Sequence, residues 1–412
     1  MTEKINNRPF LTENLPGTGG TIKNHTTDFY VEEIPLYEPS GHGTHLYFEI
    51  EKTGMPTMEA IKQIARALSI HKQDIGYAGQ KDAKAVTRQW LSIEHIMPDQ
   101  LENITVPDVT IFGSAYHKNK LKLSHLSGNI FSVKIRDIED IDKALDQANA
   151  ITEVLTKRGV PNYYGSQRFG HRNDTHLLGA AIIGDDDEKL VDLIMGHPHP
   201  SDPEEARQAR EFFDNGQYIE AASAWPKRNR TEIQIAWLLY DGKPAHKATR
   251  LIDKQQRRFY ISAFQSELFN KVLASRLKTI DKVLDGDIAC IGNKGPNFDV
   301  QEPEKEQPRC DAYEIHPTGP IFGHKMQMPQ EGTELDIESQ VLKELDLKLE
   351  DFKGKSARMA KGARRPLRFI PKDFTIAKGS DEHGEFLETK FTLPPGCYAT
   401  TVLREIIKDS TL

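Results

Sequence analysis

The feature that most constrains the fold is a change in hydrophobic spacing at Gly159, which is reversed near the C-terminal end. Before Gly159, short runs with an apolar residue at every second position predict half-buried strands. Over roughly the next 190 residues the apolar spacing is mostly that of helices, and strand character returns from Pro366 to Leu393. Strand-rich ends around a helical middle predict one discontinuous α+β domain that is interrupted by an inserted domain.

The same spacing predicts the elements. Residues 28–34 and 45–50, separated by a turn rich in Pro and Gly, predict two antiparallel strands, and Thr57 is expected to cap the helix that follows. Further strands are predicted at residues 75–78, 87–93, 109–116, 129–136, 369–370, 374–376 and 385–393, with a small strand-and-loop element over 286–330. Helices are predicted at residues 140–157, 177–183, 203–214, 219–225, 233–240, 259–277 and 337–347, with a last one starting near Thr401.

The chain is acidic overall, yet its positive charge is concentrated. It holds 54 Lys and Arg against 61 Asp and Glu, a net charge of −7. Between residues 226 and 260 nine basic residues stand against three acids, and residues 353–372 hold eight basic residues without an acid. Such segregation permits a basic face for RNA, although solvated helix faces have the same composition.

Several classes of protein are disfavoured. No run approaches the ~20 apolar residues of a membrane-spanning helix, and the first ten residues lack an apolar signal segment. The three cysteines are far apart, and the two close histidine pairs lack a third ligand at a fixed offset. We therefore expect a cytoplasmic protein without a disulfide framework, a metal site or membrane contact.

One acidic residue stands in an unusual setting between two predicted strands. Residues 76–90 contain two early glycines that permit a tight turn, and the turn presents Asp82 among Lys81, Lys84 and Arg88. Nearby positive charge keeps a carboxylate ionised, as a nucleophile or base requires. A turn aspartate among solvated lysines explains the same residues, so both interpretations stay open. The stretch lacks the Gly-x4-Gly-Lys-Ser/Thr pattern of a nucleotide P-loop.

Residues 161–170 interleave aromatic side chains with Arg, Asn and Gln. Tyr163 and Arg168 are of the types that stack on and hydrogen-bond unpaired RNA bases. The Gly and Pro residues of this stretch also suit a hinge between domains, and the two roles are compatible.

Seven ordered blocks carry a resemblance to a known family. One is Gly79-Gln80-Lys81-Asp82 followed by Thr87-Arg88-Gln89-Trp90. The others lie within residues 17–29, 117–121, 128–131, 160–170, 264–270 and 393–405. In their order along the chain, these blocks resemble the TruD family of tRNA pseudouridine synthases over nearly the whole length. Ser124 stands where the family usually has Gly, a departure that concerns a local turn and not the aspartate.

The resemblance implies a fold of class α+β. It consists of a pseudouridine-synthase catalytic core with a mixed, mainly antiparallel sheet in permuted strand order, plus an inserted, mostly helical α+β TRUD domain. The catalytic domain would comprise residues 1–159 and 363–412, and the inserted domain residues 160–362. This division agrees with the change of spacing at Gly159.

The resemblance also implies roles for five residues. Asp82 would be the catalytic aspartate, and Lys23 the basic partner that keeps it charged. Phe29 would stack near the target uracil, and Phe131 would take the place where other pseudouridine synthases have Tyr. Asn129 would hydrogen-bond the substrate.

The implied function is isomerisation of uridine to pseudouridine in tRNA, at uridine 13 in the D-stem region, by one aspartate and base flipping. Lys81, Tyr163 and Arg168 are predicted to contact RNA. No cofactor, membrane or obligate protein partner is implied, and a monomer is expected; other RNAs are further candidate substrates. One alternative is an RNA-binding or chaperone protein of this fold without essential catalysis. Another is an aspartate-nucleophile glycosidase for small substrates, which would not need the basic segments.

Overall fold

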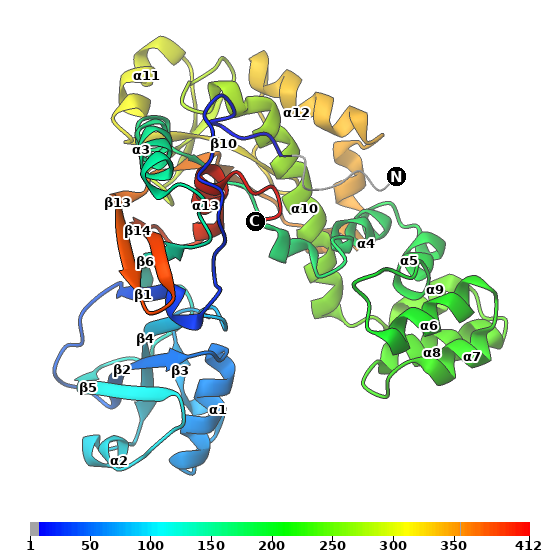
Figure 1. Cartoon of the computed structure of the whole chain (residues 1–412). Coiled ribbons are helices and arrows are strands. Elements are labelled where there is room, and N and C mark those ends of the chain that lie inside the picture. The colour runs from blue at the N-terminus through cyan, green and yellow to red at the C-terminus, as the bar shows by residue number, and fades with distance from the viewer. Residues whose placement is uncertain (1–7, 355) are drawn as a thin grey trace. The chain divides into compact units, whose positions relative to one another are not determined.

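The computed structural model describes residues 8–354 and 356–412, and their contacts divide the chain into two compact units (Figure 1). The core unit consists of Phe10–Val160 and Phe369–Asp409. The inserted unit consists of Pro161–Arg368 with short segments from both ends of the chain. The domains predicted from the sequence, 1–159 with 363–412 and 160–362, stay a prediction.

The described part of the core unit contains one eight-stranded sheet (Figure 1). Its strand order is β13-β14-β6-β1-β4-β2-β5, with β3 on β4; β1 and β4 pair in parallel and their neighbours pair antiparallel. The bounds are β1 Phe29–Pro35, β2 His45–Thr53, β3 Gly76–Tyr77, β4 Val86–Glu94, β5 Val109–His117, β6 Leu126–Ile135, β13 Lys372–Asp381 and β14 Gly384–Leu393. The predicted α+β class with a mixed, mainly antiparallel sheet is confirmed.

Strand β4 separates the two strands that the sequence analysis places first. Tyr30 of β1 lies opposite Val86 on one side of β4, and Thr53 of β2 lies opposite Val86 on the other. β1 and β2 therefore run antiparallel, as predicted, but they do not form a hairpin. The alternation of apolar and polar residues along a strand specifies which side chains face the core. It does not specify which other strand lies next to it.

Helix α1, Thr57–Ala67, covers part of this sheet through Ile61 and Ile64, which pack in one buried cluster with Phe48 of β2. The prediction that Thr57 caps α1 is wrong, because Pro56 occupies that position and the Thr57 hydroxyl bonds elsewhere. The other helices of the core unit are α2 Pro98–Glu102, α3 Ile141–Arg158, which packs on β13 and β14, and α13 Ala399–Ile407, which packs on α3.

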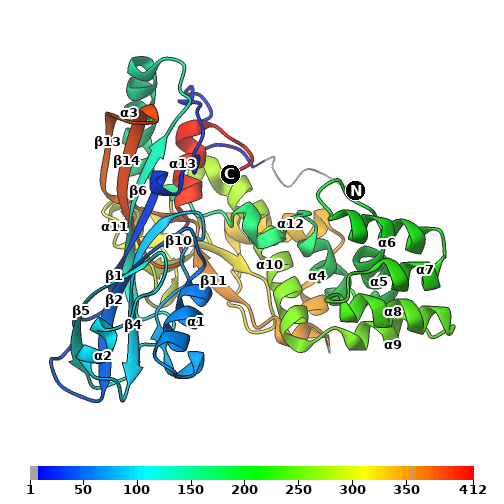
Figure 2. The same cartoon turned by 60° about the horizontal axis from the view of Figure 1, so that its bottom comes forward.

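The inserted unit is mostly helical, and its α5 to α9 gather into one lobe (Figure 2). Its helices are α4 Thr175–Ile183, α5 Asp187–Met195, α6 Glu204–Asp214, α7 Tyr218–Ala224, α8 Arg230–Tyr240, α9 Ala245–Ala248, α10 Lys254–Arg276, α11 Pro303–Asp311 and α12 Gly332–Glu344. An antiparallel sheet has the order β11-β10-β8-β9, with bounds Ala363–Pro366, Ile315–Ile321, Ile288–Ile291 and Asn297–Asp299. Short β7 Val160–Pro161 pairs with β12 Arg368–Phe369.

Three of these helices, α5, α11 and the four-residue α9, lie where the apolar spacing predicts none. α5 follows an acidic run whose Asp186 accepts a hydrogen bond from the Lys189 backbone N–H at 2.9 Å, so the run caps a helix. α11 begins at Pro303 and contains Pro308, a composition that disfavours a helix assignment from sequence. Short 3-10 turns lie at Thr26–Asp28, Lys72–Asp74, Ser166–Phe169, Thr249–Leu251, Leu277–Thr279, Leu349–Lys353 and Ser356–Met359. Within the described ranges, no helix combines the length and apolar character needed to cross a bilayer.

Candidate active site

Asp82 lies on the connection between β3 and β4, as predicted, with its side chain 35% exposed. Its carboxylate Oδ1 accepts a hydrogen bond from the Lys23 Nζ at 3.2 Å. Lys23 has a left-handed backbone (φ 62°) in a loop that is fixed to the sheet by paired backbone hydrogen bonds between Thr21 and Arg136. The fold therefore brings together the predicted catalytic aspartate and its predicted basic partner.

A second lysine holds the backbone of the aspartate. Lys52 of β2 is fully buried, and its Nζ donates to the carbonyl oxygens of Asp82 at 2.8 Å and Met55 at 2.6 Å. Burial lowers the pKa of Lys52 to about 8; the Asp82 carboxylate opposes this shift and the Lys81 ammonium adds to it. A buried ammonium is costly, so these carbonyl oxygens compensate its lost hydration and fix the loop at Asp82.

Lys81 points the other way, into the sheet. Its Nζ lies 2.6 Å from Glu33 Oε2 and donates to Asn129 Oδ1 at 2.7 Å, and both partners sit opposite each other on β1 and β6. The Lys81 side chain is 5% exposed and the Glu33 side chain 1%. Burial raises the pKa of Glu33, and the Lys81 ammonium counteracts the rise. Lys81 thus anchors the loop and has little surface left for RNA.

The Thr57 hydroxyl completes the anchoring of the loop. It accepts a hydrogen bond from the Lys81 backbone N–H at 2.9 Å and donates to Gln89 Oε1 at 2.8 Å. The Gln89 amide in turn donates to the Gly79 carbonyl at 3.2 Å. Side chains from α1 and β4 therefore hold the loop on both sides of its glycine turn.

Aromatic rings form an apolar floor on the face of the sheet that also carries Glu33 and Asn129. Phe29 and Phe131 meet edge to face with centroids 6.2 Å apart, and Phe131 stacks on Phe391 of β14 at 5.6 Å. The Lys23 Nζ lies 4.1 Å from the Phe29 ring centroid. Phe29 is 1% exposed, so its ring supports Lys23, and the predicted stack against uracil stays a prediction.

Three lysines and one buried acid, Glu33, therefore lie near the accessible carboxylate of Asp82. Lys23, Lys52, Lys81, Glu33 and Asp82 form what we call the loop cluster. Among the described residues, no three or more His, Cys, Asp or Glu side chains gather to hold a metal ion. The surplus of positive charge in the loop cluster suits a phosphate-bearing ligand.

Comparison with known proteins decides the family. The model of the tRNA pseudouridine synthase D (TruD) family matches residues 4–406. The chain belongs to this family. It is therefore an enzyme, a pseudouridine synthase of the isomerase class, which confirms the resemblance and the enzyme class predicted from the sequence.

Members of the TruD family from distant organisms resemble the chain over almost its whole length. A tRNA pseudouridine synthase D from Geotalea daltonii is 41% identical over 402 residues, which are 97% of this chain and 100% of the relative. One from Thermus thermophilus is 34% identical, covering 98% and 93% of the two chains. A crystal structure assigned to the same family, from Methanosarcina mazei, superposes with a TM-score of 0.87 at 28% identity, covering 98% and 97%.

The two remaining predicted residues, Tyr163 and Arg168, belong to the inserted unit. Tyr163 is 2% exposed, so its ring has no open face for a base, and the structure does not support the predicted RNA contact. The Arg168 guanidinium donates to the hydroxyls of Ser266, at 3.2 Å, and Ser262, and its Cζ lies 5.9 Å from the ring centroid of the exposed Phe259. Arg168 remains a candidate RNA contact of this TruD family member.

Sequence reasoning missed Lys52, Glu33 and Thr57. Lys52 follows the buried Phe48 and Ile50 at two-residue spacing, and Glu33 likewise continues the buried side of β1. A charged residue on the inward side of a strand is rare unless it is paired, and that was the available signal. Thr57 gave no such signal, because its partners come from two distant segments.

Proposed function

We propose that the protein isomerises uridine to pseudouridine in tRNA, with Asp82 as the catalytic residue. The observation that carries the proposal is a single partly exposed carboxylate, fixed by Lys23 and Lys52, in a member of the TruD family. The substrate follows from the names of the relatives, which are tRNA pseudouridine synthases over matching lengths.

One carboxylate is enough for this chemistry. The isomerisation breaks the N1–C1′ bond, turns the uracil and forms the C5–C1′ bond; C5 then loses its proton and N1 ends protonated. Hydrolytic glycosidases generally need a second carboxylate to protonate a departing group or to activate water. Here the base stays at the site and no water adds, so Asp82 acts alone on the glycosidic bond.

Each neighbour of Asp82 has a separate role in this proposal. Lys23 pairs with the carboxylate and orients it, while Lys52 fixes the backbone of Asp82 in place. The apolar floor of Phe29 and Phe131 keeps water from the detached base. Asn129, held by Lys81 through its amide oxygen, retains an amide N–H group that can bond a uracil carbonyl.

The target we propose is uridine 13 in the D-stem region. A stacked or paired uridine has to be flipped out before its glycosidic bond meets Asp82, at a cost of about a few kcal/mol. Basic residues that neutralise backbone phosphates offset this cost. In this proposal residues 1–159 and 363–412 form the catalytic domain, and residues 160–362 form an inserted TRUD domain that contributes RNA contacts.

Pseudouridine mapping of one tRNA tests the proposal. The purified full-length protein is incubated with an unmodified transcript that has uridine at position 13, and with a matched transcript that has cytidine there. We expect modification at position 13 in the first transcript and none in the second. Modification only at another position would overturn the target, and binding without modification would favour the chaperone alternative.

A further inference from the structure

The outer side of helix α8 has an unusual surface composition. Arg230, Gln234 and Trp237 follow one another at spacings of four and three residues and are all exposed, and Tyr240 adds another exposed ring three positions on. Ile235 and Ala236 on the other side of the helix are fully buried in the core of the lobe. α8 therefore has one side that stabilises the lobe and another that is left to solvent.

The two aromatic side chains on this outer side form a pair. Trp237 is 45% exposed and Tyr240 54% exposed, and their ring centroids are 5.9 Å apart at an interplanar angle of 85°. Neither residue belongs to the buried cluster of the lobe. The lobe gains little stability from rings that remain in water, and such pairs are typical of binding surfaces.

Exposed positive charge precedes and follows the pair along the chain. The first residue of α8 and the segments on either side of the helix contribute six exposed basic residues, namely Lys227, Arg228, Arg230, Lys243, Lys247 and Arg250. No ion pair joins any of these six to an acid within residues 8–354 and 356–412. Arg230 lies about 10 Å from Trp237 along the helix axis, a separation that lets one strand contact both. We call Trp237, Tyr240 and these six residues the α8 surface.

We propose that the α8 surface binds unpaired nucleotides of the RNA substrate, with bases stacked on Trp237 and Tyr240 and phosphates held by the surrounding lysines and arginines. The inference rests on the proposed tRNA substrate and assigns a second contact region, in the inserted unit. Aromatic faces next to free cations suit unpaired RNA, because every base offers a π-face and every linkage a negative charge. A protein partner would need a complementary acidic surface, whereas RNA supplies that charge throughout.

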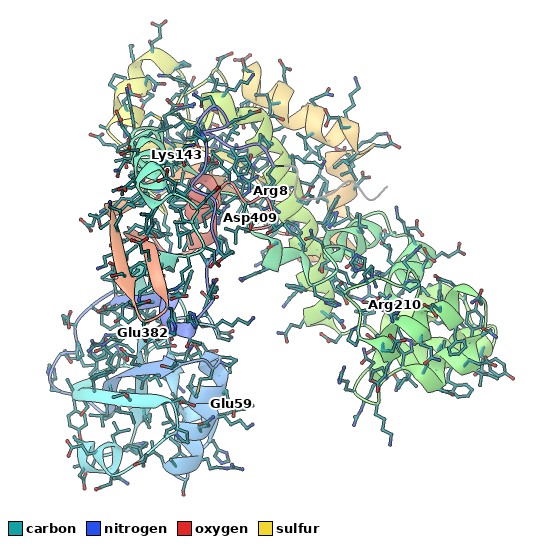
Figure 3. The ribbon with its side chains drawn as sticks, in the orientation of Figure 1. Arg8, Glu59, Lys143, Arg210, Glu382 and Asp409 are labelled. Atoms are coloured by element: carbon teal, nitrogen blue, oxygen red, sulfur yellow. The ribbon has the colours of Figure 1, made fainter. Side chains whose placement is uncertain are left out.

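Tryptophan fluorescence reports directly on the stacking of a base on Trp237. The chain has three tryptophans. Trp225 is 5% exposed, and the Cζ of Arg210 lies 5.3 Å from its ring centroid. Figure 3 labels Arg210, which lies in the helical lobe. Trp90 is partly buried in β4. Trp237 is the most exposed of the three, so a base that stacks on it quenches its emission.

The experiment titrates the full-length protein with an unmodified tRNA transcript and follows emission and affinity together. We expect the tRNA to quench the emission of the wild type and not that of Trp237→Phe. This variant keeps a ring for stacking, and any loss of its emission measures how much light the RNA absorbs. The double variant Trp237→Ala/Tyr240→Ala is expected to bind about 5- to 100-fold more weakly. Leu345→Ala, which truncates another exposed apolar side chain of the inserted unit, is the matched control and should bind like the wild type.

The outcomes separate this inference from the proposed function. If the wild type binds tRNA, yet Trp237→Phe is quenched as strongly and the double variant binds as tightly, the α8 surface is not an RNA contact, while tRNA modification stands. If the wild type does not bind tRNA at all, the proposed function and this inference both fail.

Discussion

The molecule contains two clusters of charged side chains that differ in access to solvent. In the inserted unit, Arg276 pairs with Asp287 at 2.7 Å and with Glu334, and Arg364 pairs with Glu338 at 2.6 Å, with all five side chains at most 1% exposed. We call these five residues the interior cluster. The loop cluster of the core unit ranges from the buried Lys52 to Asp82, whose side chain is 35% exposed.

The difference shows how similar residues come to serve different purposes. Burial raises the pKa of Glu334 and of Glu338, and the guanidinium groups of Arg276 and Arg364 oppose the rise, so the interior cluster compensates its charges within itself. In the loop cluster the lysines and Glu33 are buried or mostly buried, whereas the Asp82 carboxylate is accessible to a ligand. We infer that the interior cluster acts on stability and the loop cluster on catalysis.

The largest effect is expected from Arg276→Met, because it leaves buried carboxylates without their partner. We expect the free energy of unfolding to fall by about 3–5 kcal/mol in urea titrations. Lys305→Met, which breaks an ion pair whose side chains are 72% and 61% exposed, should change it by less than about 1 kcal/mol. Equal losses of unfolding free energy in both variants would contradict the distinction between buried and exposed ion pairs.

Lys52→Met tests the loop cluster. We expect kcat to fall about 10- to 100-fold as Asp82 loses its backbone anchor, while the affinity for tRNA is kept. Lys52 carries its charge below its pKa of about 8, so wild-type kcat should decline as pH rises through 8 in a step that the variant lacks. Lys62→Met, at an exposed position of α1, is the control. Wild-type kcat in Lys52→Met would refute the positioning role.

Thr57→Val separates the loop anchor from helix capping. The change leaves the Lys81 backbone N–H without an acceptor, which costs about 1–3 kcal/mol. We expect a few-fold loss of kcat, measured with saturating tRNA. Thr57→Ser keeps the hydroxyl and should restore the rate; equal rates in the Val and Ser variants would count against the anchor.

The smallest effect concerns acid stability of the inserted unit. Burial lowers the pKa of His316 to about 4, so between pH 6.5 and 4 the unfolded chain binds a proton that the folded chain does not. His316 therefore removes stability as pH falls through that window. We expect His316→Gln to lessen this loss by about 1 kcal/mol per pH unit, compared in urea titrations at pH 6 and 5. His71→Gln, at an exposed site, should leave the wild-type slope unchanged; an unchanged slope in His316→Gln would contradict the assignment.

The sequence predicted the local features of the fold and left the spatial neighbours undetermined. Apolar spacing located β4, α3 and α10, and the turn at Gly79 put Asp82 on a loop. The position of β4 between β1 and β2 depends on long-range pairing that alternation does not encode.

The same limit applies to the candidate site. The pairing of Lys23 with Asp82 was expected from family resemblance, whereas Lys81 was assigned to RNA and instead binds Glu33. Tyr163 is buried although its stretch reads as polar, because whether an aromatic residue faces solvent depends on tertiary packing.

The rate of pseudouridine formation by Asp82→Asn tests the central claim most directly. The amide keeps the size of the side chain and removes its charge, and the purified variant is assayed with saturating tRNA alongside a binding titration. We predict a rate at least about 1,000-fold below wild type with tRNA affinity unchanged within about twofold. A wild-type rate in Asp82→Asn would contradict the account, because the accessible carboxylate would then not be the group that performs the isomerisation.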